Sequence, residues 1–406
     1  MEKKIKEMYT EYTYPKYEKY MDEYKPVPNK FSHGLFLEQI NHYIYKGKKN
    51  NFENYSVLVV GVGLGQDIIN MGFLLKEYKT RLVGIDLSST SLNICKERLK
   101  KYDLENDIEL IEMSLLDLDP KVHGKFDCII CIGVLHHLED PQIGLNCINK
   151  VLKDDGFMYI MVYGKYGRTG IYQMQDLMKK INYNCNDFKN KINNFKNTYK
   201  QLPENNWFKK GENLVNDHNI SDEGIVDMLL HHQDRAYSIP ELYEWINNSG
   251  LNIIEFSAIY RYKYKYDIDG IKYPDNIIEK YSINELFFGD IKMHTFYLSK
   301  NKNTKASINE LDNILLLESI SKENLNKILE FYKLNKVNNL NVNLSLTHKI
   351  NNKYQWDLGV KFINLNILMN DIIYTILNNI DNKRKIIEIF DIVRDELNIN
   401  NTNNEL

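Results

Sequence analysis

A short apolar run at residues 56–60 passes directly into a glycine-rich turn, and this junction constrains the fold more than any other part of the sequence. Residues 59–67 read VVGVGLGQD, with glycines at positions 61, 63 and 65. Glycine adopts left-handed backbone angles at little cost, so this spacing lets a strand turn sharply into a helix. It also leaves room for a ligand against the backbone. The junction therefore predicts a strand–turn–helix unit that binds a ligand at its turn.

The same alternation of apolar runs and helical spacing continues along the chain. The runs that predict parallel strands are 56–60, 81–85, 108–113, 126–132 and 157–163. Two later runs, within 252–264 and 292–298, predict an antiparallel strand hairpin. Together they predict an α/β fold with a doubly wound, mostly parallel, seven-stranded sheet. Ligands bind such sheets beyond the carboxyl ends of the strands, so residues there are the candidate site.

The 406 residues are enough for two or three domains, and shifts in composition predict where they divide. Residues 1–50, crowded with tyrosines near the start, predict an N-terminal lead-in, whose tyrosines fit half-buried packing residues. Residues 51–300 predict the α/β domain, with its core at 56–163 and a helical substrate insertion at 165–250. Residues 301–406, rich in Asn, Lys and Leu, predict a small helical C-terminal domain.

Charge and cysteine usage exclude several classes of protein. The net charge of -3 argues against a globally basic nucleic-acid binder. Basic and aromatic residues alternate at 261–266, which predicts a strand edge with solvated lysines in preference to a nucleic-acid surface. No run approaches the roughly 18 apolar residues of a membrane span, and no signal peptide is visible. Cys128 and Cys131 lie inside an apolar run, which predicts buried thiols, no metal site and a cytoplasmic protein.

Polar residues follow the second and third predicted strands. Asp86 comes 25 residues after Gly61, where an acid can accept both hydroxyls of a ribose. The alternative is that Asp86 caps the next helix, which begins near Ser88. Ser114 follows the third predicted strand, with Leu115 beside it.

Residues 126–138, FDCIICIGVLHHL, closely resemble the motif after the fourth strand of class I S-adenosylmethionine-dependent methyltransferases. The G-x-G-x-G turn at residues 61–65 resembles motif I of that family, whereas a dinucleotide fingerprint would read G-x-G-x-x-G. Residues 152–157, LKDDGF, resemble the family's turn into its fifth strand. The resemblance covers residues 56–163 and implies S-adenosylmethionine as the cofactor. It also implies that the lead-in, with Tyr14, Pro15 and residues 31–34, folds over the cofactor as a lid.

The resemblance also implies which residues contact the cofactor. These are Gly61, Gly63, Gly65, Asp67, Asp86, Leu87, Ser114, Leu115, Gly133 and Val134. Val59 departs from the family pattern, since an Asp or Glu that helps hold the methionine end is usual at this position. Asp67 is a candidate to compensate for it. The missing acid also favours the alternative of a catalytically silent S-adenosylmethionine-binding regulatory protein.

The methyl acceptor is left open, because in-line transfer requires mainly a nucleophile behind the methyl carbon and exclusion of water. The candidate catalytic residues are His136, Tyr163, Arg168, His231 and Tyr237. The combination of core, insertion and helical tail is similar to bacterial methyltransferases with an appended domain, some of which act on protein lysines. We therefore predict methyl transfer to a protein side chain or small molecule. An RNA methyltransferase is a further alternative, against which the net charge argues.

Overall fold

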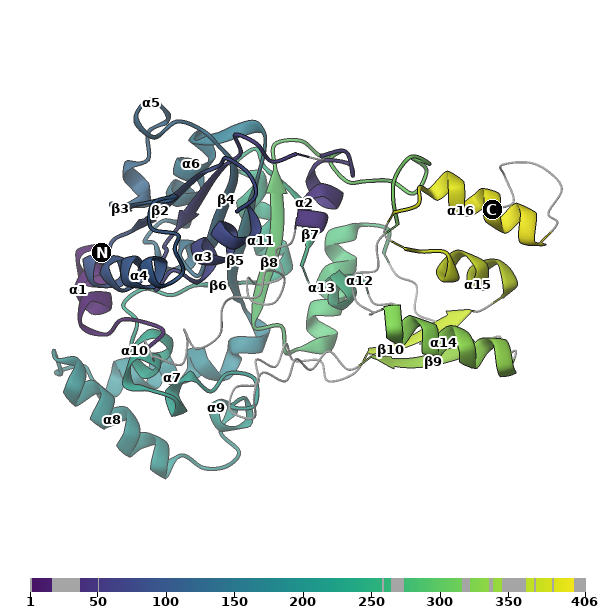
Figure 1. Ribbon diagram of the computed structural model, residues 1–406. Helices are drawn as coiled ribbons and strands as arrows, with labels where there is room; N and C mark the ends of the chain where they lie inside the picture. The colour runs from purple at the N-terminus through teal and green to yellow at the C-terminus, as the bar shows by residue number, and fades with distance from the viewer. Residues whose placement is uncertain are drawn as a thin grey trace. The chain divides into compact units, whose positions relative to one another are not determined.

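The computed structural model describes most of the chain, and the chain divides into two compact units. The described residues are 2–16, 37–49, 51–257, 259–263, 274–315, 322–335, 339–344, 363–368, 370–381 and 383–397. One unit comprises residues 1–44 and 49–304, and the other comprises residues 45–48 and 305–406 (Figure 1). The division after residue 304 lies close to the boundary at 301 that composition predicts.

The first unit is built around an eight-stranded sheet. Seven strands follow the order β3-β2-β1-β4-β5-β8-β7, and the short β6 pairs with β5. The strands are β1 (Ser56–Val60), β2 (Arg81–Asp86), β3 (Ile108–Glu112), β4 (Phe126–Ile132), β5 (Leu152–Gly164), β6 (Ala236–Tyr237), β7 (Asn252–Phe256) and β8 (Met293–Ser299). The first five run parallel, and β8 is antiparallel to both β5 and β7. This confirms the predicted fold class, although the sheet has one strand more than predicted because β6 is too short to leave a pattern.

Helices cover both faces of the sheet (Figure 1). On one face, α6 (Pro141–Lys150) and α11 (Ile239–Asn247) join the largest apolar core through residues such as Leu145 and Leu242. On the other face, α3 (Gln66–Leu74) packs closely on β2, since a side chain at Gly84 would clash with Ile68. The helix α4 (Ser89–Lys101) is capped by Ser88, whose hydroxyl accepts a hydrogen bond from Ser91 N–H. The described part also contains α2 (Leu37–Ile44), α5 (Pro120–His123) and α13 (Ile277–Phe288).

The predicted strand at 252–264 is wrong in its second half. β7 ends at Phe256, and residues 259–263 form the helix α12 (Ile259–Lys263). The Tyr262 ring stacks on Phe256 with centroids 4.0 Å apart, and Arg261 is buried in an ion pair with Asp290. The basic–aromatic alternation therefore does not mark a solvated strand edge, and residues 264–266 lie outside the described ranges.

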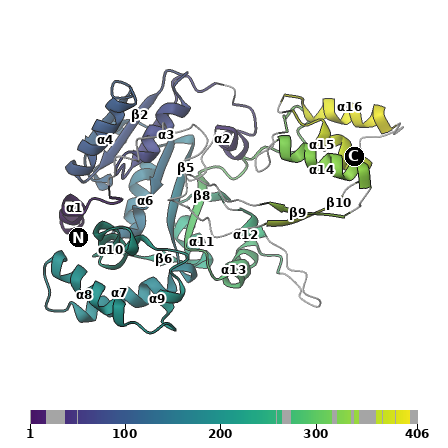
Figure 2. The same ribbon diagram turned by 60° about the horizontal axis from the view of Figure 1, so that its bottom comes forward.

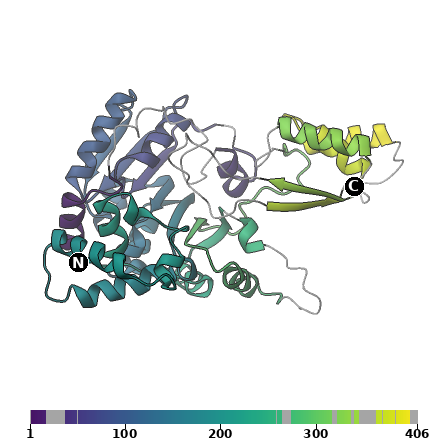
Figure 3. The same ribbon diagram turned by 90° about the horizontal axis from the view of Figure 1, so that it is seen from below.

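A helical insertion between β5 and β7 has its own small core. It consists of α7 (Thr169–Ile181), α8 (Phe188–Gln201), α9 (Trp207–Lys210) and α10 (Asp222–Leu229). Met174, Phe195 and Val226 meet in this core, and Met8 of α1 (Glu2–Glu11) joins them. Figures 2 and 3 show α7, α8 and α9 grouped together, with α10 beside them. The insertion is thus a separate helical subdomain that follows the carboxyl end of β5.

Composition predicts a helical second unit, but the structure shows a unit of both helices and strands. It contains α14 (Lys322–Asn335), α15 (Asp371–Asn378), α16 (Ile386–Leu397) and the antiparallel pair β9 (Asn339–Leu344) and β10 (Ile363–Leu368). Leu325, Leu329 and Tyr332 of α14 form its small core with Ile373 and Leu377 of α15. In the described part of the chain, no helix has both the length and the apolar content that a membrane crossing requires.

We expect a chain that ends at Thr304 to bind S-adenosylhomocysteine as the full chain does. The predicted cofactor residues all belong to the first unit, and the Thr304 hydroxyl donates to the Tyr43 carbonyl within that unit (2.7 Å). Calorimetric titration of both chains measures the effect. A truncated chain with native circular dichroism but no binding would show that the first unit is not self-sufficient.

Candidate active site

The glycine turn after β1 opens onto space on one side only. Gly61, Gly63 and Gly65 have φ angles of 69°, 52° and 89°, which L side chains rarely adopt. A Cβ added at Gly61 would lie 2.3 Å from Val134 Cγ2, and one at Gly65 would lie 2.5 Å from Cys95 Sγ. A Cβ added at Gly63 would meet no atom within 4 Å. Gly63 is therefore the glycine of this turn that leaves room for a ligand.

The Asp86 carboxylate lies directly beside this open glycine. Its Oδ2 accepts from Gly63 N–H and its Oδ1 from Ser88 N–H, both at 2.8 Å. Burial raises the pKa of Asp86, and these backbone donors oppose the rise. Since Ser88 itself caps α4, the side chain of Asp86 is not needed as the helix cap. Each carboxylate oxygen keeps a further lone pair, so Asp86 can still accept two ribose hydroxyls.

The other predicted cofactor residues follow neighbouring strands at the same edge of the sheet. Ser114 follows β3 and donates through its hydroxyl to Glu2 of α1 (2.5 Å), while Leu115 beside it is buried. Gly133 follows β4 with a φ of 75°, and a Cβ there would make ordinary contact with Met161 Cε at 3.9 Å. Because β3, β2, β1 and β4 are adjacent in the sheet, these residues lie with the glycine turn along one carboxyl edge, where sheets of this kind bind ligands in a crevice.

Val59 is buried in the sheet and cannot offer a charge to this crevice. Its backbone pairs with Gly84 and Ile130, and Ile130 in turn pairs with Tyr159, so their side chains share the α3 face. Asp67 lies in the first turn of α3, which packs on that face. Burial, and to a smaller extent the nearby Asp67 carboxylate, raises the pKa of Tyr159. The Asp67 carboxylate therefore lies near the α3 face of the sheet, on which position 59 has no acidic side chain.

A second group of polar side chains is buried at the carboxyl ends of β4 and β5, and we call it the acceptor-side cluster. Its members are His136, His137, Tyr163, Arg168, Asp227, His231 and Asp234. The His136 ring stacks on Tyr163 at 3.9 Å, and the Arg168 guanidinium lies 3.5 Å from the Tyr163 ring centre. His137 stacks on His231 at 3.8 Å. The structure thus brings together four of the five predicted catalytic candidates.

Tyr237, the fifth candidate, lies elsewhere. Its ring stacks on Trp245 at 4.9 Å within the core of the sheet, and Arg235 lies 4.8 Å from the ring centre. Its packing contacts are therefore with the fold and not with the acceptor-side cluster.

Two aspartates of the cluster were not singled out by the sequence. Asp227 accepts from the Tyr9 hydroxyl (2.7 Å), and burial raises its pKa. Asp234 accepts from the Tyr172 hydroxyl (3.2 Å) and Gln175 Nε2 (2.9 Å), with Arg168 Nη2 at 3.7 Å. The sequence signal for Asp227 was a lone acid on the otherwise apolar face of α10, because acidic side chains are rarely buried unless they are paired.

Several atoms of the cluster have no hydrogen-bond partner within the described chain. These are Nδ1 and Nε2 of His136, Nε2 of His231, and Nε and Nη2 of Arg168. Burial lowers the pKa of His136 and His231 well below the usual range, and neighbouring His137 lowers both further. Both imidazoles are therefore neutral near pH 7. Buried polar atoms without partners are costly, so this cluster is suited to a polar ligand.

The first helix, α1, contacts both parts of the site. Glu2 accepts from Ser114 at the crevice, Lys6 pairs with Glu112 at the end of β3 (2.6 Å), and Tyr9 donates to Asp227 in the cluster. These contacts are compatible with a lid, which stays a prediction. The other segment of that predicted lid, residues 31–34, lies outside the described ranges.

We expect His136 to make folding stability depend on pH. Its folded pKa lies below that of an unfolded histidine, so as pH falls below about 6.5 the unfolded chain takes up a proton first. Stability is then lost by about 1.4 kcal/mol per pH unit for this histidine until its folded pKa is reached. Urea unfolding of the parent and of His136→Gln between pH 7 and pH 5 should give a shallower decline for the variant. Equal slopes would contradict a neutral, buried His136.

The sheet order and its helices define a Rossmann-like α/β fold, and comparisons with known proteins agree. Residues 58–158 match the family model of the methyltransferase domain. An uncharacterized protein of Synechococcus sp. is 32% identical over 206 residues, which are 50% of this chain and 48% of that protein. The ubiquinone biosynthesis O-methyltransferase of Pelagibacter ubique is 28% identical over 124 residues, or 30% of this chain and 47% of the relative. The chain therefore spans about half the length of these curated relatives.

Solved structures extend the likeness to the wider chain. PKMT2 from Rickettsia typhi superposes with a TM-score of 0.58 at 19% identity, covering 89% of this chain and 69% of that one. The same protein in complex with AdoHcy gives a TM-score of 0.56 at 18% identity, covering 93% and 72%. Residues 58–158 are a methyltransferase domain, and the chain has the Rossmann-like fold of these neighbours.

Proposed function

We propose that the protein transfers a methyl group from S-adenosylmethionine to an acceptor bound at the acceptor-side cluster. The observation that carries the proposal is the open side of Gly63 next to the Asp86 carboxylate. A ribose has the two adjacent hydroxyls that such a carboxylate accepts, and the glycine leaves space for it. The methyltransferase-domain match over residues 58–158 and the AdoHcy complex of PKMT2 support the same cofactor.

The cofactor would lie along the carboxyl ends of β1 to β4. Asp86 would accept the ribose hydroxyls, Ser114 and Leu115 would border the adenine, and Gly133 and Val134 would border the methionine part. When bound, S-adenosylmethionine supplies a methyl group that is already activated on a sulfonium. Asp67 would stabilise the ammonium of the methionine part in place of an acid at position 59. The protein then has to place the acceptor and exclude water.

The charges of the acceptor-side cluster favour an amine as the acceptor. The cluster holds one permanent cation, Arg168, against the carboxyl groups of Asp227 and Asp234, so an entering ammonium is stabilised electrostatically. Tyrosine rings add cation–π attraction. An ammonium must lose a proton before its lone pair can attack, and neutral His136 has two unpartnered nitrogens. A protein side chain and a small-molecule amine both satisfy these requirements.

A catalytically silent cofactor-binding protein is the second candidate, and buried Val59 is the observation that favours it. Without an acid at this position, contacts to the methionine part depend on Asp67. If that part is held loosely, the cofactor can bind through its adenosine without being aligned for transfer. Binding and methyl transfer must therefore be measured separately.

Tritiated methyl transfer from S-adenosylmethionine into fractionated cell lysate tests the proposal. We expect label in the protein or the small-amine fraction, and its loss in Asp86→Ala. Label in the RNA fraction would mean that the methyl acceptor is RNA and not an amine. Binding of S-adenosylhomocysteine without label in any fraction would contradict the enzymatic proposal and support the silent binder.

A further inference from the structure

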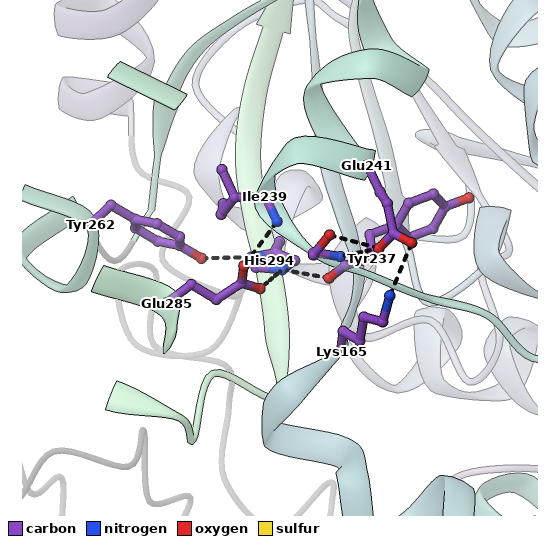
Figure 4. Close-up of polar contacts among 8 residues, drawn as sticks. Lys165, Tyr237, Ile239, Glu241, Tyr262, Glu285 and His294 are labelled. Carbon is purple, nitrogen blue, oxygen red and sulfur yellow. Dashed lines mark hydrogen bonds and ion pairs between the residues drawn. The ribbon is translucent and has the colours of Figure 1, made fainter. Parts of the chain in front are cut away.

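A fully buried histidine, His294, lies on β8, next to the strand β5 whose end carries part of the acceptor-side cluster. The His294 side chain is inaccessible to solvent, and so is that of Glu285 on α13. His294 Nδ1 lies 2.9 Å from the Tyr262 hydroxyl, and Nε2 lies 3.0 Å from the Tyr237 carbonyl and 3.2 Å from Glu285 Oε1 (Figure 4). One imidazole thus joins residues from four separate segments of the chain.

The contacts of His294 determine which nitrogen carries the proton. The Tyr237 carbonyl can only accept a hydrogen bond, and the Glu285 carboxylate is an acceptor when ionised. Both approach Nε2, so Nε2 must carry a hydrogen and donate. The Tyr262 hydroxyl can either donate or accept, so it is compatible with Nδ1 in either state. A donor at the position of Nε2 is therefore the property that this site requires of residue 294.

The same two acceptors hold the short strand β6 and the start of α11. Within the part of the chain that the structure describes, β6 pairs only with the end of β5, at Tyr163 and Gly164. The Tyr237 carbonyl also accepts from Lys165 N–H (3.0 Å), and Glu285 Oε2 accepts from Ile239 N–H (2.9 Å), the first residue of α11. Figure 4 shows the contact between Ile239 and Glu285 beside His294. The imidazole and the carboxylate thus add to the two residue pairs with β5 and to the buried Tyr237 ring in holding β6.

The segments held in this way carry the acceptor-side cluster. Arg168 follows Lys165 by one short turn and stacks on Tyr163, at the end of β5. His231 and Asp234 directly precede β6. We propose that His294, with Glu285, is a positioning residue that holds these two segments at the spacing the acceptor needs. This rests on the proposed function, since it assigns His294 a part in placing the acceptor.

A purely structural role and a positioning role predict different results, because of the energetics of buried pairs of polar side chains. Removing one partner leaves a buried group uncompensated and is strongly destabilising. Replacing both with apolar residues of similar volume is often neutral or stabilising. The double variant His294→Leu/Glu285→Leu should thus recover stability, yet leave the Tyr237 carbonyl with Lys165 N–H alone and the Ile239 N–H without its partner.

The experiment compares variants of the full chain by hydrogen exchange, calorimetry and methyl transfer. The probes are S-adenosylhomocysteine and the lysate fraction that the parent chain labels. In His294→Gln the amide nitrogen reaches the place of Nε2, whereas in His294→Asn it does not. His218→Gln is the matched control, because His218 is also buried against a glutamate, Glu212 (2.7 Å), but within the insertion.

We expect His294→Asn and the double variant to lower the maximal transfer rate by about tenfold or more, since small misplacements are costly. S-adenosylhomocysteine affinity should stay within about twofold, because the cofactor contacts are untouched. Exchange of the Lys165 amide should accelerate in both. His294→Gln and His218→Gln should stay within about threefold of the parent rate and keep the Lys165 amide protected.

Unchanged Lys165 exchange in His294→Asn would overturn the proposal, and so would a double variant that recovers both stability and transfer rate. A parent chain that labels no fraction contradicts the proposed function instead. In that case the exchange comparison of His294→Gln with His294→Asn still decides whether His294 holds the two segments.

Discussion

Replacing Asp86 with alanine should weaken binding of S-adenosylhomocysteine by an order of magnitude or more, if both ribose hydrogen bonds are lost. Hydrogen bonds to a charged group contribute about 1.5–3 kcal/mol each, so even partial loss is measurable. The carboxylate also accepts from Gly63 and Ser88 N–H, so its removal loosens the turn that cradles the ligand. Isothermal titration calorimetry measures the dissociation constant directly.

Two further variants separate ligand binding from folding in this test. Asp86→Asn keeps one oxygen acceptor and should fall between the parent and Asp86→Ala. Asp107→Ala removes an exposed carboxylate just before β3, at the opposite edge of the sheet, and should bind as the parent does. If folded Asp86→Ala binds with unchanged affinity, Asp86 does not belong to the site.

Gly61→Ala and Gly63→Ala should lose different properties although they lie two residues apart: mainly folding stability in the first, and cofactor affinity in the second. At Gly61 the added methyl overlaps Val134, and overpacking of about 1–3 kcal/mol adds to left-handed backbone strain of about 1–2 kcal/mol. At Gly63 only the backbone strain applies, but the methyl group enters the space assigned to the cofactor. Urea unfolding should therefore show the larger loss for Gly61→Ala. Calorimetry should show lost cofactor affinity for the still folded Gly63→Ala.

The decisive outcome is the affinity of Gly63→Ala for S-adenosylhomocysteine. Parent-like binding by this variant would mean that the open side of Gly63 does not face the ligand. The crevice would then have to be placed elsewhere along the carboxyl edge of the sheet.

The parallel core was predictable because its strands are buried on both faces and end at recognisable residues. Runs such as 57–60 and 128–132 are continuously apolar, which an exposed strand would not tolerate. Gly61 and Asp86 mark where strands stop, and parallel topology then brings their carboxyl ends to one edge. Local sequence and simple topology together therefore predict the cofactor half of the site.

The acceptor half was only partly predictable, because it depends on packing between distant segments. Asp227 is one of three acids in the amphipathic helix α10. Only the tertiary fold reveals that Tyr9, 218 positions away in the sequence, donates a hydrogen bond to it. The alternation at 261–266 fits a strand as well as a short helix, and stacking of Tyr262 on Phe256 decides for the helix. β6 has two residues and no periodicity at all.

The position of β8 between β5 and β7 has a consequence for synthesis of the chain on the ribosome. Among the described strands β7 pairs with β8 alone, and β8 is made later, so the edge of β5 stays open until Ser299 has been translated. An open apolar edge is a template for pairing with other chains. Expression fragments that stop between residues 257 and 292 should therefore aggregate, whereas fragments that include residue 299 can close the sheet.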